Sequence, residues 1–215
     1  GTTVYFSKRP LSLESIKTQV SISSLIKNKM SSSNIEVTTK SILLNDLIKF
    51  IRTTTNKPEL FILEKIVKKG HVIIDLRLNI DENGKIKNDY EIEGLIKDAS
   101  INFLNKANFK NINFNFNFQK DNYFFNEINF QAEEVKFISK KLNIKKKKNS
   151  FLIDAVVEND QSSLNLNMLK LLNLSFKNII VDDAKFKTNN EFSLEIDEKF
   201  KVKNIILSSD INITQ

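Results

Sequence analysis

The sequence predicts a mainly β protein, an extended and curved antiparallel sheet that forms an apolar groove, with two short helices near residues 42–69. Two observations lead to this fold class. From His71 onward, apolar residues recur at every second position, which gives each strand one dry face and one wet face. The chain of 215 residues also has only four glycines and two prolines, so few corners interrupt the strands between residues 71 and 215.

Two segments that precede this alternation have helical spacing. Residues 42–53 place their apolar side chains on one face of a helix, which predicts a short amphipathic helix. Residues 58–69 are expected to form the second helix. Pro58 suits its first turn, and Gly70 lies just past its expected end.

A β-hairpin is expected over residues 71–97. Its first strand alternates apolar and polar residues, and so does its return strand. Between them lies Asn83-Gly84, a dipeptide typical of a tight hairpin turn because both of its residues accept positive φ.

Further strands are expected along the rest of the chain. Residues 10–25 offer one or two, and the others are 109–119, 124–132, 135–144, 151–158, 162–170, 174–181, 184–188, 191–196, 200–207 and 210–214. The lysine run 145–148 is expected at a turn, where its charges are solvated. Residues 1–70 are expected to form a mixed segment of strands and a helical pair, and residues 71–215 the sheet, the whole being a fragment of a longer chain.

A short internal echo runs through the second part of the chain. It reads "FKNI" at 109–112, "FNEI" at 125–128, "FKNI" at 176–179 and "VKNI" at 202–205. The unequal spacings exclude a solenoid of fixed repeat length. The echo indicates one kind of strand added repeatedly.

Composition argues against several classes of partner. The formal net charge is +7, but arginine occurs only at positions 9, 52 and 77, whereas nucleic-acid recognition favours the arginine fork. The phenylalanines alternate with asparagine rather than with basic residues, which is not the pattern of a stacking platform for bases. With no cysteine in the chain, disulfides and thiolate metal sites are excluded.

Residues able to do catalytic chemistry are nearly missing. His71 is the only histidine, and no serine or threonine can be assigned a histidine base. The acidic pairs 133–134 and 182–183 do not suit acid–base catalysis, because neighbours on a strand point to opposite faces. The start of a calcium loop at residues 81–84 is better explained as a turn. We therefore expect no enzyme activity, no catalytic or metal site and no cofactor.

The order of these features resembles the AsmA-like proteins of Gram-negative envelopes, the YhdP and TamB type. The resemblance rests on "HVIIDLRLNIDENGKIKNDYEIEGLIKDASINFLNKANFKNINFNFNF" and "FFNEINFQAEEVKF", preceded by a helical pair that ends in "KKG". It implies a periplasmic protein anchored in the inner membrane by a segment outside this sequence. It also implies a curved sheet whose hydrophobic groove carries phospholipid toward the outer membrane, with acyl chains and other envelope proteins as partners.

Strand parity alone selects the residues expected to line such a groove. They are Val72, Ile74, Leu76, Leu78, Ile112, Phe114, Phe116, Phe118, Phe151, Ile153, Ala155 and Val157.

The alternative is a non-enzymatic structural or adhesive protein, a β-sandwich or solenoid whose dry face is an ordinary closed core. A closed core binds no lipid, whereas an open groove carries lipid or aggregates when stripped of it. For the groove, Phe116→Asp is expected to block lipid passage more than Asn115→Asp does.

Overall fold

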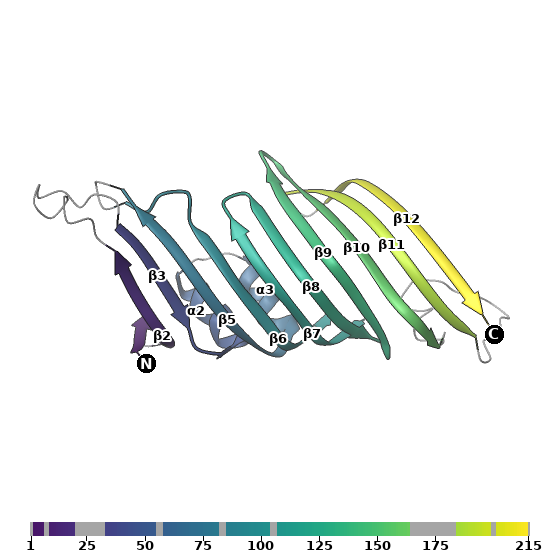
Figure 1. Cartoon of the computed structure of the whole chain (residues 1–215), viewed down its shortest axis with the longest axis horizontal. Coiled ribbons are helices and arrows are strands. Elements are labelled where there is room, and N and C mark those ends of the chain that lie inside the picture. The colour runs from purple at the N-terminus through teal and green to yellow at the C-terminus, as the bar shows by residue number, and fades with distance from the viewer. Residues whose placement is uncertain are drawn as a thin grey trace, which may run out of the picture.

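The computed structural model describes residues 2–6, 9–19, 33–54, 58–81, 85–103, 107–163, 184–198 and 201–214. These residues form one twelve-stranded antiparallel sheet that is curved and not closed, together with two short helices (Figure 1). The predicted fold class is thereby confirmed.

The strands follow one another across the sheet almost in chain order. They are β1 (Thr2–Phe6), β2 (Arg9–Gln19), β3 (Ser33–Thr39), β4 (Ile42–Leu43), β5 (Val67–Ile80), β6 (Glu91–Phe103), β7 (Ala107–Gln119), β8 (Asn122–Ala132), β9 (Val135–Lys147), β10 (Ser150–Ser163), β11 (Lys185–Asp197) and β12 (Val202–Thr214). The spatial order is β1-β2-β3-β5 and then each strand in turn to β12, while the short β4 pairs with the start of β5. The sheet therefore crosses the boundary expected at residue 70, because β1 to β3 join the same sheet as β5.

Both expected helices are present, as α2 (Leu44–Thr54) and α3 (Pro58–Ile66). They lie behind the sheet in Figure 1, and α2 contacts β5 while α3 contacts β5 and β6. The second helix was predicted to continue to residue 69, which is wrong, because Val67 already pairs with Ile101 in β6. Gly70 therefore does not end a helix. It lies inside β5 at φ +138°, where an added Cβ would sit 2.8 Å from the Ala99 Cβ.

The hairpin of β5 and β6 confirms the pairing predicted for residues 71–97. Val72 lies opposite Ile96, and Leu76 lies opposite Ile92. The Asn83-Gly84 turn falls outside the described residues. At its border, the Asp81 carboxylate accepts a hydrogen bond from the Lys85 backbone N–H at 2.9 Å.

The strands predicted at 109–119, 124–132, 135–144 and 151–158 are confirmed as β7 to β10, each somewhat longer than expected. The lysine run was predicted at a turn, but its first three residues belong to β9. Lys145 pairs with Leu152 and Lys147 with Ser150, so the turn begins only at Lys148.

Two strands were wrongly predicted as pairs of shorter ones. The single strand β11 (Lys185–Asp197) covers the pair predicted at 184–188 and 191–196. The single strand β12 (Val202–Thr214) covers the described part of the pair predicted at 200–207 and 210–214. The polar residues between them, such as Asn190 and Ser209, pair with each other and keep the ladder continuous. The strand predicted at 174–181 lies outside the described residues. So does the strand predicted at 162–170, apart from its first two residues, which belong to the end of β10.

A band of β-bulges crosses the middle of the sheet. In six strands two consecutive residues are both exposed where strict alternation would bury one of them, at 68–69, 97–98, 110–111, 126–127, 140–141 and 160–161. The pairing registers shift near these positions, and Asp98, Asn111 and Glu127 have positive φ. Bulges bend a strand and increase its twist. We therefore attribute the curvature of the sheet to this band.

The bulges also explain the internal echo. The two middle residues of "FKNI" at 109–112 and of "FNEI" at 125–128 are the bulged pairs of β7 and β8. In "VKNI" at 202–205 the register of β12 against β11 shifts in the same way. The repeated tetrapeptide is an apolar–polar–polar–apolar bulge signal, and the copy at 176–179 lies outside the described residues.

Candidate functional site

The dry face of the sheet is continuous from β6 to β12. Residues paired across antiparallel strands lie on the same face, so the registers can be followed from strand to strand. One row runs through Gly94, Phe116, Phe125, Leu142, Ala155, Phe192 and Leu207, and the next through Ile92, Phe118, Tyr123, Ile144, Ile153, Leu194 and Ile205. Apart from the glycine, every member of the two rows is apolar or aromatic.

All twelve residues expected to line a groove belong to β5, β7 or β10. Val72 is only 1% exposed and Phe116 only 7%, and Ile112 and Ala155 are also buried. The other eight are half-buried: Ile74, Leu76, Leu78, Phe114, Phe118, Phe151, Ile153 and Val157. The register brings Ile74 and Leu76 to the same face as Phe116 and Phe118, through Gly94 and Ile92 of β6.

Aromatic side chains form the centre of the dry face. The Phe116 ring stacks on Phe118 with centroids 4.8 Å apart, and Phe125 packs edge-on against Phe118 at 5.4 Å and against Phe114 at 5.6 Å. Tyr123 extends the cluster toward the ends of the strands, edge-on to Phe118 at 5.4 Å. Beyond the bulges, a second group forms where Phe130 stacks on Phe137.

Sequence reasoning missed the part of this surface contributed by β8, β9, β11 and β12. Phe125, Leu142 and Phe192 are examples, and each lies opposite a residue of the predicted set or its direct neighbour in the row. Bulges in β8 and β9 interrupt the alternation, so no single parity describes these strands. The signal that could have found them is the pair of consecutive polar residues at each bulge.

The helices cover only one end of the dry face. Their contacts are with β2, β4, β5 and β6, and Ile48 of α2 is buried beneath the sheet. From β8 to β12, no described helix makes a comparable contact, and all described strands belong to the one sheet. The dry face therefore has no second layer over its larger part, as far as the described residues go.

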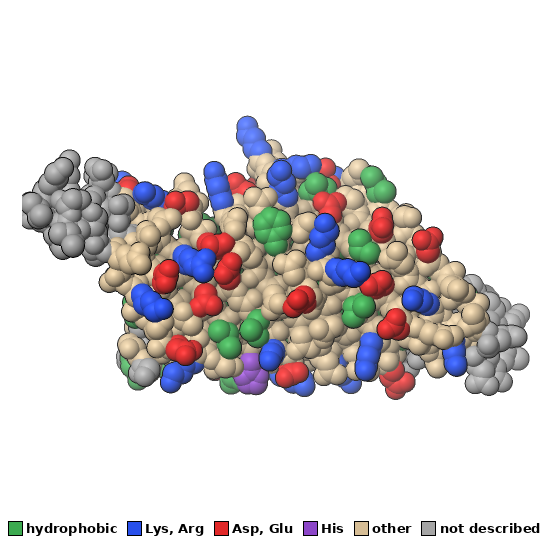
Figure 2. Space-filling view, viewed as in Figure 1, with side chains coloured by type: hydrophobic (Ala, Val, Ile, Leu, Met, Phe, Trp, Pro, Cys, Tyr) green, Lys and Arg blue, Asp and Glu red, His purple; other side chains and the backbone are tan. Residues whose placement is uncertain are grey.

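A ladder of side-chain hydrogen bonds connects neighbouring strands along the wet face. Asn117 donates to Glu91 at 2.9 Å and to Glu93 at 2.8 Å, and Gln119 donates to Glu91 at 2.7 Å. Arg77 also donates to Glu91, at 3.0 Å. Figure 2 shows the face of the sheet turned away from the helices, where charged side chains of both signs are interspersed.

These hydrogen bonds set the protonation of Glu91. The donated bonds from Asn117 and Gln119, followed by that from Arg77, lower the pKa of this carboxyl group and outweigh the opposing effect of desolvation. Further along the ladder, Asn115 donates to Glu127 at 2.7 Å. The asparagines that alternate with phenylalanine in β7 thus bind neighbouring strands together.

A buried polar cluster lies on the dry face next to the bulge of β10. The side-chain oxygen of Asn159 (Oδ1) accepts hydrogen bonds from the Thr188 hydroxyl at 2.6 Å and from the Thr188 backbone N–H at 3.0 Å. The side-chain amide nitrogen of Asn159 donates to the backbone carbonyl oxygen of Phe186 at 3.3 Å. Asn159 is 1% exposed and its bonds are satisfied within the chain, which indicates a structural role.

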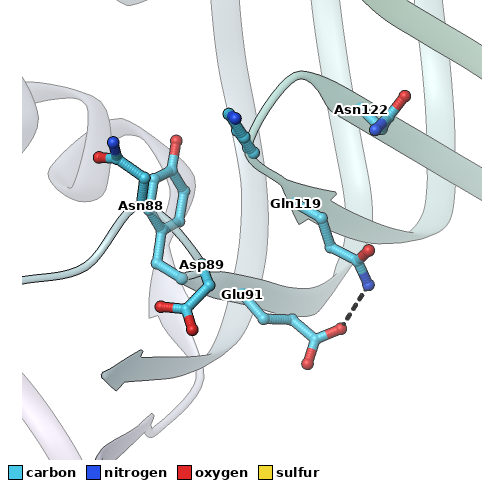
Figure 3. A pocket seen from close by; sticks show the side chains of 7 residues that line it. Asn88, Asp89, Glu91, Gln119 and Asn122 are labelled. Carbon is cyan, nitrogen blue, oxygen red and sulfur yellow. Dashed lines mark hydrogen bonds between the residues drawn. The ribbon is translucent and has the colours of Figure 1, made fainter. Parts of the chain in front are cut away.

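An open, polar hollow of about 570 Å³ lies where β6 begins and β7 ends (Figure 3). Asn88, Asp89, Glu91, Gln119 and Asn122 line it, together with Tyr90 and Lys120. The Gln119–Glu91 hydrogen bond spans part of its wall. Within the hollow, the Glu91 carboxylate already accepts hydrogen bonds from Asn117, Gln119 and Arg77.

Groups that suggest chemistry lie apart from one another. His71 is exposed on β5, and Glu133 and Glu134 occupy the two-residue turn between β8 and β9, both with positive φ. No group of three or more potential ligands that could hold a metal ion occurs among the described residues. Within the same residues, neither helix is long and apolar enough to cross a membrane.

Comparison of the chain with protein-family models, with curated proteins and with solved structures finds no match. The resemblance to AsmA-like proteins therefore stays a prediction.

Proposed function

We propose that this chain is a segment of a bridge-like lipid transport protein that carries phospholipids between the inner and outer membranes of a Gram-negative bacterium. In this proposal the protein is periplasmic, is anchored in the inner membrane by a segment outside this sequence, and holds acyl chains on the dry face of the sheet. Headgroups stay in water at the open edge. The observation that carries the proposal is a continuous apolar face with no described layer over it from β8 to β12.

The dimensions of the sheet suit lipid tails. Eleven strands lie side by side, because β4 only pairs with the start of β5, and at ~4.8 Å spacing they give a surface on the order of 50 Å across the strands. An acyl chain spans half of a hydrocarbon core ~30 Å thick, so a tail of ~15 Å covers about three strands. Several lipids could therefore lie side by side along the groove.

The energetics suit transport more than tight capture. Each buried methylene contributes ~0.8 kcal/mol, and the interaction has no preferred direction. The aromatic and aliphatic lining offers few polar groups that would fix a tail at one position, so tails can exchange along the face. A large apolar surface left in water is unfavourable for a soluble protein, which supports an apolar occupant.

The test uses a photo-crosslinking residue at position 153 and, in a separate variant, at position 154. Ile153 is half-buried on the dry face, in the row with Ile144 and Leu194, whereas Asp154 is exposed on the wet face of the same strand. The two variants are otherwise matched in strand and in distance from the turns. The full-length protein is irradiated in living cells, purified and analysed for bound phospholipid by mass spectrometry.

Lipid crosslinked at 153 and not at 154 is the expected result. Crosslinking at 153 only within the chain, with normal folding, would mean that the dry face is a closed core and would refute the proposal. Position 115 is a poor wet-face control, because its amide donates to Glu127, and Asn115→Asp would place two carboxylates together.

A further inference from the structure

Lysines gather at one end of strands β7 to β10. The turn between β7 and β8 contains Lys120, and the end of β9 with the turn that follows contains the lysines at 145–148. The same two turns contain one acidic residue, Asp121. The Lys146 backbone N–H donates to the Asp121 carbonyl oxygen at 2.7 Å, so the two turns lie side by side. We call the five lysines the lysine rim.

The lysine rim lies in the interior of the strand order. Each of β7 to β10 pairs with a neighbour on both sides, so the ends of these strands are an internal feature of the sheet. At the opposite ends of β8 and β9, the turn between them carries Glu133 and Glu134. The two ends of these strands therefore differ in charge.

Lys146 stands on the dry face at this end of the sheet. It pairs with Phe151, which in turn pairs with Ile196, and residues paired across antiparallel strands share a face. Along β9 it continues the parity of Leu142 and Ile144, which are half-buried, while Lys146 itself is exposed. A lysine in this position lays its aliphatic stem along the apolar surface and keeps its ammonium group in water.

Most charges of the rim are not neutralised by the chain. Within the described residues, Lys120, Lys145, Lys146 and Lys148 make no ion pair. Lys147 differs, because its Nζ lies 3.9 Å from Oε2 of Glu195. Four positive charges are thus left to attract an anion at this end of the dry face.

Tyr123 adds a hydrogen-bond donor close to the rim. It lies in the dry row between Phe118 and Ile144, with its ring edge-on to Phe118 at 5.4 Å. Desolvation, followed by the nearby Tyr90 and Asp121, raises the pKa of its phenol, which therefore stays protonated at neutral pH. Tyrosine and lysine join an apolar stem to a polar end, and both are typical of protein surfaces at the headgroup level of a membrane.

We propose that the lipids held on the dry face carry a net negative headgroup, which the lysine rim binds, with Lys146 nearest the acyl chains. The proposal rests on the proposed function and adds the class of lipid to it. Any phospholipid phosphate would be attracted to the rim, but the ammonium group of a zwitterionic headgroup would meet five lysines and one carboxylate. A headgroup without that cation avoids the repulsion. The acyl chains supply affinity, and the rim selects among headgroups.

The test measures which headgroup accompanies the lipid captured at position 153. Ile153 lies directly opposite Ile144, two residues from Lys146 along β9. The full chain with a photo-crosslinking residue at 153 is incubated with vesicles that contain equal amounts of phosphatidylglycerol and phosphatidylethanolamine with identical acyl chains. After irradiation, mass spectrometry gives the ratio of the two crosslinked lipids. Because both come from the same vesicle, attraction of the protein to the vesicle surface cancels in this ratio.

Lys146→Gln and Lys145→Gln form a matched pair of variants. Both residues are exposed neighbours in β9, but Lys145 pairs with Asn122 and Leu152 and so lies on the wet face. We expect the parent protein to capture at least about fivefold more phosphatidylglycerol, and Lys146→Gln to lower the ratio about fivefold, as for one lysine beside an anionic lipid. Lys145→Gln should change it less than about twofold. High salt should lower the ratio of the parent protein, because these charges are exposed and become screened.

Two results would overturn this proposal and leave the proposed function intact. One is capture of both lipids at 153 in equal amounts. The other is an equal effect of Lys145→Gln and Lys146→Gln on the ratio, which would mean that no site on the dry face distinguishes the headgroups. Capture of neither lipid at 153, with circular dichroism showing a folded protein, would refute the proposed function and this proposal with it.

Discussion

Gly94 is the position where the dry face is most sensitive to a single added methyl group. It lies in β6 between Ile92 and Ile96, directly opposite Phe116 of β7. A Cβ at Gly94 would lie 2.5 Å from Cζ of Phe116 and 2.2 Å from the carbonyl oxygen of Ile73. The Phe116 ring therefore occupies the space that a side chain at 94 would fill, and this glycine allows the ring to be buried.

The expected cost of Gly94→Ala follows from these distances. Real Cβ atoms do not approach closer than 3.0 Å, so the β5 backbone must retreat by about 0.8 Å. Overpacking costs about 1–3 kcal/mol, and contact with backbone rather than with a flexible side chain favours the upper end, about 3 kcal/mol. Reduced freedom of the unfolded chain offsets up to about 1 kcal/mol. We expect a net loss of about 2 kcal/mol in the free energy of unfolding.

Urea unfolding followed by circular dichroism measures this loss, and a double-mutant cycle with Phe116→Leu tests its origin. The smaller side chain should relieve the contact with Cζ but not the contact with Ile73, so we expect a coupling energy of about 1 kcal/mol. Ile96→Val, on the same face two residues away, is the control for a general loss of packing. A Gly94→Ala protein within about 0.5 kcal/mol of the parent would refute the close approach of the ring.

Three further predictions concern the wet face, the buried polar cluster and the dry face. The lowered pKa of Glu91 stabilises the fold above the usual carboxyl pKa, and this stabilisation is lost as the pH falls through the folded value. In Glu91→Gln the midpoint of urea unfolding should therefore fall less on acidification than it does in the parent protein. An unchanged dependence of the midpoint on pH would contradict the stabilising role of the hydrogen bonds to Glu91. Asn159→Ala should cost about 2 kcal/mol, because Thr188 loses the acceptor of two hydrogen bonds, and thermal unfolding would show it. Ile153→Glu should slow transfer of a fluorescent phospholipid between vesicles by about tenfold or more, since a carboxylate against acyl chains is costly. Asp154→Gln should leave the rate unchanged, and equal rates in the two variants would contradict the assignment of faces.

The alternation of apolar and polar residues was enough to predict the sheet and the side of β5, β7 and β10 that forms the dry face. A period of two fixes the face of every residue in a regular strand, and "NINFNFNF" in β7 is such a stretch. The two helices followed from a change of period. The end of α3 could not be predicted in this way, because a glycine such as Gly70 suits either the end of a helix or a strand position with a close neighbour. Only the pairing of Val67 with β6 shows that the strand has already begun.

The bulges could not be predicted from alternation alone. Two polar residues in a row, as at 97–98 or 140–141, look like the end of one strand and the start of another. Tertiary pairing carries the strand through each of them and changes the parity of the residues beyond. For this reason alternation alone does not place Phe130 and Phe137, which stack on each other, on the dry face, although the repeated tetrapeptide marks the bulge before Phe130.

The alternation of asparagine with phenylalanine along β7 has a physical reason in an open sheet. A dry face without a second layer cannot fix the register of its strands, because contacts among half-buried rings and aliphatic chains have little directional preference. Directional bonds must then come from the other face, where Asn113 donates to Asn129 at 2.9 Å and Asn117 donates to Glu93 at 2.8 Å. The wet face thereby holds the strands in place, and the dry face stays free of polar groups along the two rows. In the function we propose, this division lets acyl chains slide over one face while the other keeps the sheet intact. Replacing asparagines on the wet face should therefore affect stability, whereas a charge on the dry face should affect transfer.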